Sequence, residues 1–228
     1  SVSAQSKPIL LPRSAGEHLV YCTPFNRVIA LDPATGRERW TYDPQVPRSS
    51  ERPYRCRGVA YAEVPQVDAR SACRHRIYTA TNDRRLIALD ARDGRPCAAF
   101  GTNGVVDLVE HERDGLERVG TSSPPAVANG VVVVGSSVID FAYAEAPRGV
   151  IAAYDADTGA ARWSFGPLRG VGGTGAGNAW APLAVDAERD LVFVPTGAPS
   201  PDYYGALRPG RNDRANSVVA LRLATGEV

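Results

Sequence analysis

One short pattern occurs four times along the 228-residue chain, and it limits the possible folds more than any other feature of the sequence. Each copy is an apolar run that ends a few residues before a glycine, and three copies carry an Asp four positions before that glycine. The glycines are 58, 65 and 67 residues apart and are Gly36, Gly94, Gly159 and Gly226. An Asp side chain caps turn amides and Gly accepts a positive φ, so each copy predicts a hairpin closed by a tight turn.

A second β-rich run precedes each of these hairpins, at 19–22, 76–79, 131–134 and 191–194. A spacing near 60 residues leaves room for about four strands and their loops in each unit. We therefore predict an all-β fold, a β-propeller of four-stranded antiparallel blades with about three to four blades in this chain. We expect one domain over 1–228, with 1–18 as a tail or an incomplete first blade. Trp40 and Trp163 follow two of the turns and are predicted to wedge between neighbouring blades.

Composition excludes several functional classes. The 26 basic and 25 acidic side chains give a net charge of +1, which argues against a nucleic-acid partner. No apolar run approaches the roughly 20 residues of a membrane-spanning helix. The chain has no methionine, so we expect it to be a piece of a longer protein whose further blades close the ring.

The four cysteines form no Cys-x-x-Cys pair and the three histidines are scattered, so the sequence argues against a zinc site. An even number of cysteines permits disulfides, but it is equally compatible with buried free thiols. The sequence does not choose among the three possible pairings of Cys22, Cys56, Cys73 and Cys97.

Candidate functional residues lie in long inserts that depart from the repeat. Gly-rich residues 170–182 lack the pattern of a dinucleotide or phosphate loop, so they are either a flexible loop or a stretch that lets Trp180 lie flat on a planar ligand. Asp140 is either a turn cap or a functional acid. Arg57 is either a solvated charge or a ligand-binding cation.

Taken together, the inserts resemble a known family, the pyrroloquinoline quinone (PQQ)-dependent dehydrogenases, and most closely its membrane-bound glucose/quinate/shikimate branch. Six motifs in the same order carry the resemblance, which runs from about residue 19 to the C-terminus. They are the Asp-x-x-Thr-Gly-x-x-x-Trp turns, Cys-Arg-Gly-Val-Ala-Tyr (56–61), Cys-Arg-His-Arg-Ile-Tyr (73–78), Thr-Ser-Ser-Pro-Pro (121–125), Asn-Ala-Trp-Ala-Pro (178–182) and Pro-Asp-Tyr-Tyr-Gly (201–205).

The resemblance implies an eight-bladed propeller around PQQ and a calcium or magnesium ion. It assigns PQQ-binding roles to several residues: Trp180 as the stacking floor, Arg57 beside the reactive carbonyl, Ser122 and Ser137 as hydroxyl donors, and Asn178 next to the stacked ring. It makes Asp140 the metal ligand. The family's catalytic Asp lies in a His-Asp-x-Trp-Asp segment that we expect downstream of Val228, so no catalytic residue is assigned in this chain.

The function implied by the resemblance is oxidation of a sugar or cyclic polyol of the glucose, quinate or shikimate type. Hydride passes to PQQ and electrons pass on to a membrane quinone, on the periplasmic side of a bacterial inner membrane with an anchor outside this chain. We expect the 228 residues alone to be inactive. The alternative is a non-catalytic envelope propeller that acts as a scaffold for protein assembly.

Overall fold

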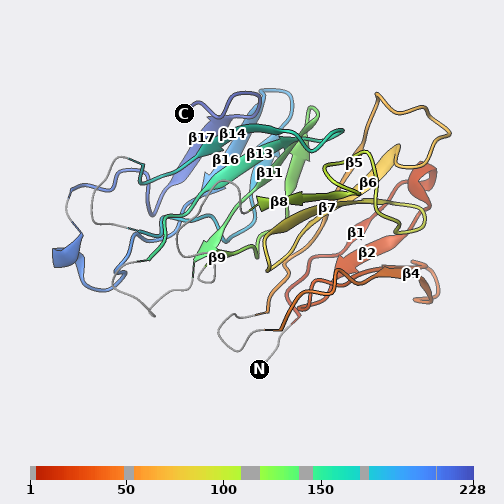
Figure 1. The fold of residues 1–228 in the computed structure, drawn as a ribbon, viewed down its shortest axis with the longest axis horizontal. Coiled ribbons are helices and arrows are strands. Elements are labelled where there is room, and N and C mark those ends of the chain that lie inside the picture. Colours follow the sequence, from red (N-terminus) through yellow and green to blue (C-terminus); the bar gives the residue numbers. More distant parts are fainter. Residues whose placement is uncertain (1–3, 49–53, 109–118, 139–145, 170–174, 209) are drawn as a thin grey trace.

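The computed structural model describes residues 4–48, 54–108, 119–138, 146–169, 175–208 and 210–228. Its strands form four antiparallel sheets that follow one another along the chain (Figure 1). The first sheet contains β1 (Ile9–Leu10), β2 (Leu19–Cys22), β3 (Val28–Leu31) and β4 (Glu38–Tyr42), and the second contains β5 (Ala60–Glu63), β6 (His75–Ala80), β7 (Arg85–Asp90) and β8 (Val105–Asp107). The third contains β10 (Ala126–Ala128), β11 (Val131–Val134), β13 (Ile151–Asp155) and β14 (Ala161–Phe165), and the fourth contains β15 (Ala184–Asp186), β16 (Leu191–Pro195) and β17 (Val218–Arg222).

Two small additions complete the described structure. Strands β9 (Val119–Gly120) and β12 (Ser137–Val138) form a separate ladder, and two short 3₁₀ helices occur at Arg13–Ala15 and Gly205–Leu207. In the described ranges no helix is both long enough and apolar enough to cross a bilayer.

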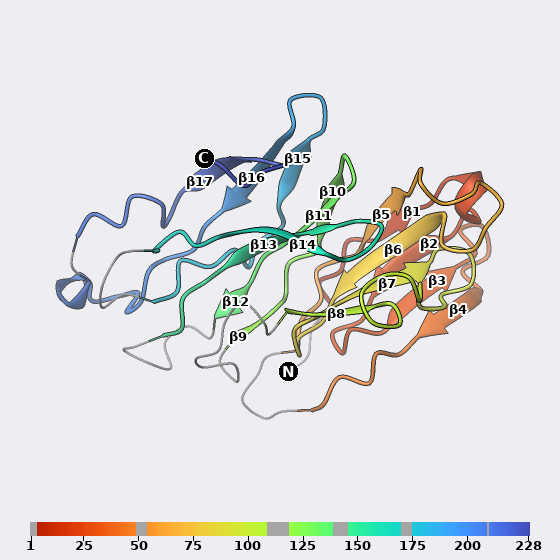
Figure 2. The same ribbon diagram turned by 45° about the horizontal axis from the view of Figure 1, so that its top comes forward.

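Each sheet is a simple meander, and the sheets lie side by side in chain order (Figures 1 and 2). The first strand of the third sheet, β10, contacts the first strands of both neighbours, β5 and β15. This places the first strands innermost, as in the blades of a propeller. The predicted all-β propeller is confirmed, with three four-stranded blades and a three-stranded fourth. Residues 9–10, from the expected tail or incomplete blade, form the short strand β1.

Three apolar layers hold the blades together, one between each pair of adjacent sheets. The middle strands alternate between two layers because successive side chains of a strand point to opposite faces. In β11, for example, Val132 and Val134 pack toward the second blade while Val131 and Val133 pack toward the fourth. Strands buried on both faces are continuous apolar runs, which explains the four-valine sequence.

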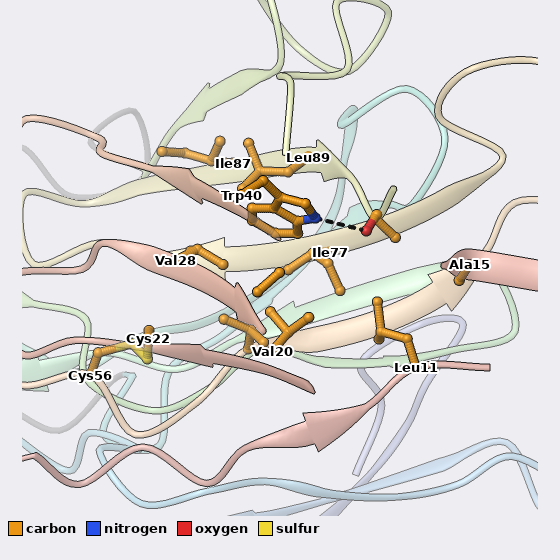
Figure 3. Close-up of a cluster of buried hydrophobic side chains, with 13 residues drawn as sticks. Leu11, Ala15, Val20, Cys22, Val28, Trp40, Cys56, Ile77, Ile87 and Leu89 are labelled. Carbon is orange, nitrogen blue, oxygen red and sulfur yellow. Dashed lines mark hydrogen bonds between the residues drawn. A yellow bond between two sulfur atoms is a disulfide. The ribbon is translucent and has the colours of Figure 1, made fainter. Parts of the chain in front are cut away.

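At each junction between blades, a side chain of one blade donates a hydrogen bond to a backbone carbonyl at an equivalent position in the next blade. The Trp40 indole N–H donates to the Ala91 carbonyl at 3.3 Å (Figure 3), and the Trp163 indole donates to the Leu223 carbonyl at 2.9 Å. These two tryptophans therefore wedge between blades, as predicted. Because the blade between them has no such tryptophan, the Tyr78 hydroxyl donates instead to the equivalent carbonyl, that of Ala156, at 2.6 Å.

An ion pair between the buried Arg76 and the partly exposed Asp157 reinforces the junction that lacks a tryptophan. The Arg76 side chain is 1% exposed and donates to the carbonyls of Ala156 and Asp157 and to the Asp157 carboxylate at 2.6–3.0 Å. Val106 and Phe100 take the place of the indole against the turn glycine, since a Cβ on Gly159 would lie 2.7 Å from Cγ2 of Val106 and 3.3 Å from the Phe100 ring. A buried guanidinium is tolerated only when its donors are satisfied, as they are here.

The repeated Asp caps its own turn, as the sequence indicates. The Asp155 carboxylate accepts hydrogen bonds from the backbone N–H groups of Asp157 and Thr158, both at distances under 3 Å, and pairs with Arg162 at 2.6 Å. Partial burial raises the pKa of Asp155, but the Arg162 and Thr158 hydrogen bonds outweigh it and bring the pKa to about 2.

Two disulfides settle the pairing that the sequence left open: Cys22–Cys56 and Cys73–Cys97. The first joins the end of β2 in the first blade to the segment that leads into β5 (Figure 3). The second joins two loops of the second blade. Disulfides of this kind are typical of proteins that fold in an oxidising compartment.

Replacing the turn glycines tests the wedge contacts. Gly36 and Gly94 both have a positive φ, +71° and +74°, so alanine at either position costs about 1–2 kcal/mol of backbone strain. A Cβ on Gly94 would also lie 2.5 Å from the Trp40 ring, whereas nothing lies within 4 Å of one on Gly36. Gly94→Ala is expected to lower the free energy of unfolding by about 1–3 kcal/mol more than Gly36→Ala in chemical denaturation. Equal losses would contradict the wedge.

The turn carboxylates make the free energy of unfolding depend on pH. Because the folded-state pKa of Asp155 lies below its ordinary 3.8, its contribution to the free energy of unfolding is present above pH 4 and is lost as the pH falls toward about 2. Asp155→Asn should flatten that part of the profile, as followed by denaturant unfolding at stepwise pH. Asp213→Asn, at an exposed carboxylate, is the control and should leave the profile unchanged; an unchanged profile in Asp155→Asn would contradict this assignment.

Candidate functional site

Four of the predicted site residues come together from loops that lead into successive blades. Arg57 precedes β5, Ser122 lies between β9 and β10, and Asn178 and Trp180 precede β15. Since β5, β10 and β15 are the innermost strands, the loops that enter them converge at one end of the propeller's inner edge. The site is therefore built by the second, third and fourth blades together.

The backbone carbonyl of Trp180 is the meeting point of this group. Nη1 of Arg57 and Oγ of Ser122 both donate to it, each at 3.4 Å. The Arg57 guanidinium carbon lies 5.0 Å from the centroid of the Trp180 ring, within the range of a cation–π contact. Residues separated by 123 positions are thus held against one another by several weak contacts.

The exposed surfaces of these two side chains suit a flat anionic ligand. Trp180 is 43% exposed although the residues that directly precede it, 175–179, are buried. Arg57 is half-buried, and burial, followed by the charge of Arg55, lowers its pKa. No carboxylate pairs with Arg57 in the described ranges, so the cation has its charge available for an anion.

Asn178 fixes the loop beneath Trp180. The Asn178 side chain is 1% exposed and donates through Nδ2 to the carbonyl of Ser136 at 3.2 Å, while its own carbonyl accepts from the Gly197 N–H at 2.7 Å. A Cβ on Gly149 would lie 2.3 Å from the Asn178 Cα, and one on Gly135 would lie 2.1 Å from the Ala179 carbonyl oxygen. Glycine is required at both positions because the backbones approach so closely.

The remaining two predicted residues have different outcomes. Ser137 lies in β12 opposite Gly120, near the Ser122 loop, and its hydroxyl makes no hydrogen bond with the four converging residues in the structure described. Asp140, the predicted metal ligand, lies outside the described residues. Within the part of the chain that is described, no cluster of three His, Cys, Asp or Glu side chains could hold a metal ion.

Sequence reasoning missed one residue that supports the site and one buried hydroxyl next to Ser122. Ser136, rather than its neighbour Ser137, supports Asn178, and its hydroxyl accepts from the Val150 N–H at 2.9 Å. The Ser123 hydroxyl is buried and has no hydrogen-bond partner among the described residues. The serine pairs at 122–123 and 136–137 were visible in the sequence, but only the three-dimensional register shows which member faces which partner.

Comparison with known proteins identifies the family of the chain. The family model described as "PQQ: Glucose/ethanol/alcohol dehydrogenase, beta-propeller domain" matches residues 1–228. The chain belongs to the PQQ-dependent quinoprotein dehydrogenase family, so the resemblance stated above is confirmed.

Three curated relatives show how much of such a protein the chain represents. Quinoprotein glucose dehydrogenase A of Acinetobacter calcoaceticus is 34% identical over 99% of this chain, and the glycerol dehydrogenase large subunit of Gluconobacter oxydans (strain 621H) is 38% identical over 94%. The quinate/shikimate dehydrogenase (quinone) of Acinetobacter baylyi (strain ATCC 33305 / BD413 / ADP1) is 34% identical over 96%. The chain spans 30–31% of the length of these relatives.

A solved structure supports the same fold. Quinohemoprotein alcohol dehydrogenase from Comamonas testosteroni is similar to the whole of this chain with a TM-score of 0.77 and 26% sequence identity. This chain covers 34% of that protein. The loops that carry Arg57, Ser122 and Trp180 therefore belong to a quinoprotein propeller.

The glycine contact behind Asn178 gives a test of the site that needs no ligand. Gly149→Ala should push Asn178, and with it Trp180, away from Arg57. The emission of Trp180, taken as the part of the tryptophan fluorescence that is lost in Trp180→Phe, should then shift to longer wavelength. Gly166→Ala is the matched control because its Cβ would meet nothing closer than 3.6 Å. Identical Trp180 emission in the two glycine variants would contradict the proposed support.

Proposed function

We propose that this chain forms part of a PQQ-dependent dehydrogenase that oxidises a hydroxyl group of a sugar or cyclic polyol. The observation that carries the proposal is the convergence of Arg57 and Ser122 on the carbonyl of Trp180. It leaves an indole face at the inner edge of the propeller, beside a cation that pairs with no carboxylate of the described residues. PQQ is a flat ring system with three carboxylates, so an aromatic floor with cationic and hydroxyl donors fits it.

Each residue of the site has a proposed role. Trp180 stacks on the ring system and Arg57 holds an oxygen at its reactive edge. Ser122 and Ser137 donate hydroxyl hydrogen bonds to carboxylates or carbonyls, and Asn178 orients the stacking loop. Asp140 is proposed as a ligand of a calcium or magnesium ion, since carboxylate oxygens are what these hard cations prefer.

When bound, PQQ supplies the carbonyl carbon that accepts a hydride from the substrate carbon. The Arg57 guanidinium favours negative charge on the adjacent oxygen because it is half-buried and has no competing carboxylate among the described residues. The buried wall formed by Asn178 and its neighbours excludes water from one side of the site. The proton of the substrate hydroxyl goes to a carboxylate base, which we place outside these 228 residues because the sequence contains no His-Asp-x-Trp-Asp segment.

The names of the relatives support a polyhydroxy substrate of the glucose, quinate or shikimate type and extend the range to glycerol. We propose that electrons pass from PQQ to a membrane quinone on the periplasmic side of a bacterial inner membrane. The two disulfides are consistent with that compartment.

The experiment is a PQQ titration of the protein in calcium buffer, followed by quenching of tryptophan fluorescence. Trp180→Ala should weaken PQQ binding about tenfold or more, which corresponds to about 1.4 kcal/mol of lost stacking, whereas Trp180→Phe keeps an aromatic face and should stay within a few-fold of the parent. Dye reduction with glucose, quinate, shikimate and glycerol then identifies the substrate.

Two outcomes would contradict the proposal. If PQQ does not bind, the result favours the alternative function, a non-catalytic envelope propeller that acts as a scaffold. If PQQ binds equally to Trp180→Ala and the parent, the cofactor occupies a different site.

A further inference from the structure

The segment that carries Arg57 is tied to the first blade at its preceding residue. Cys56 forms the disulfide with Cys22, at the end of β2, and both residues are almost completely buried, at 3% and 1% exposure. Figure 3 shows this disulfide at the edge of the apolar layer between the first two blades. The position of Arg57 is therefore linked covalently to a blade that supplies none of the four converging residues.

The backbone of Arg57 has a second tie close to the first. The Lys7 N–H donates to the Arg57 carbonyl at 3.0 Å, and Lys7 forms a parallel bridge with Gly58. The Cys22 N–H in turn donates to the Ser6 hydroxyl at 3.0 Å. Residues 6–7, Cys22 and 56–58 thus form one connected bracket, which we call the Arg57 bracket.

The Arg57 bracket holds a segment whose side-chain contacts with Trp180 are weak. The described residues on either side of the gap before Arg57, 43–48 and 54–59, form no strand, so the bridge between Lys7 and Gly58 is the only strand-like pairing of these described residues. The Arg57–Trp180 contacts are one hydrogen bond at 3.4 Å and one ring contact at 5.0 Å, and each of these is weak on its own. An ordered backbone reduces the entropy that the side chain loses when it adopts the bound position.

We propose that the Cys22–Cys56 disulfide is a positioning device for the ligand site: it fixes the backbone of Arg57 so that the guanidinium stays against Trp180. The geometric part stands on the contacts alone, and only its consequence for PQQ binding rests on the function proposed above. Cys22 and Cys56 touch no ligand in this arrangement and act through Arg57.

The second disulfide provides a matched control. Cys73–Cys97 encloses 24 positions and Cys22–Cys56 encloses 34, so their loss releases similar chain entropy in the unfolded state. Cys73 precedes β6, whose first residue, His75, pairs with Glu63 at the far end of β5 from Arg57. The control pair therefore lies at the opposite end of the same blade.

The test compares Cys22→Ala/Cys56→Ala with Cys73→Ala/Cys97→Ala in the otherwise unchanged protein. The first readout uses no cofactor: the Trp180 emission, taken as the difference from a Trp180→Phe partner, together with its quenching by acrylamide. Loss of the Cys22–Cys56 pair should shift this emission to longer wavelength and raise quenching about twofold, while loss of the control pair should change neither.

The second readout is PQQ affinity in a double-mutant cycle with Arg57→Ala. Loss of the Cys22–Cys56 pair should weaken PQQ binding about tenfold in the parent and have little further effect once Arg57 is alanine, because the two changes remove the same interaction. The control pair should leave affinity within about twofold. Lys7→Pro, which removes the donor to the Arg57 carbonyl and keeps both disulfides, is a milder second variant and should act in the same direction.

The outcomes separate this inference from the proposed function. The positioning role is wrong if loss of either disulfide changes the Trp180 emission equally. It is also wrong if the loss of PQQ affinity in Cys22→Ala/Cys56→Ala adds fully to the loss in Arg57→Ala. If the Cys22→Ala/Cys56→Ala protein does not fold, an unchanged Trp180 emission in Lys7→Pro overturns it. If the emission responds as expected but PQQ does not bind the parent, the positioning role stands and the proposed function fails.

Discussion

The junction between consecutive blades is the interaction on which the rest of the structure depends. At each of the three junctions a ring donor of one blade reaches the carbonyl that follows the third strand of the next: Trp40 to Ala91, Tyr78 to Ala156 and Trp163 to Leu223. A directional hydrogen bond at the edge of an apolar layer fixes both the distance and the rotation between two sheets, which hydrophobic burial alone does not do because it is non-directional. Since the same carbonyl is used each time, every blade repeats the orientation of the one before it, and the first strands β5, β10 and β15 line up.

The site follows from that alignment. Loops that enter successive inner strands meet at one end of the propeller, so residues as distant in sequence as Arg57 and Trp180 come within hydrogen-bonding distance. The individual contacts are weak, and the surrounding backbone supplies the precision: glycines at 135 and 149 allow the Asn178 loop to pack closely, and the Cys22–Cys56 disulfide fixes the entry to β5. A site whose loops are tied to a rigid scaffold loses little entropy when a ligand binds.

The sequence predicts the blade repeat well because its signal is local. Asp155 and Gly159 stand at fixed positions in one turn, and Trp163 follows at a fixed distance, so each can be interpreted within about ten residues. The sequence does not predict that Tyr78 replaces the missing tryptophan at the second junction, since the hydroxyl and its acceptor are 78 residues apart. Disulfide pairing is unpredictable for the same reason, because it depends on distances that only the folded chain defines. The family motifs predict that Arg57 is a site residue, whereas its contact with the Trp180 carbonyl comes from the structure.

The most direct test of the account is an experimental structure of the protein with PQQ bound. We predict that the PQQ ring system lies against the face of the Trp180 indole, with one of its oxygens about 3 Å from the Arg57 guanidinium. PQQ bound at another place, with Arg57 and Trp180 making no contact to it, would contradict the claim that the loops of three blades build the cofactor site.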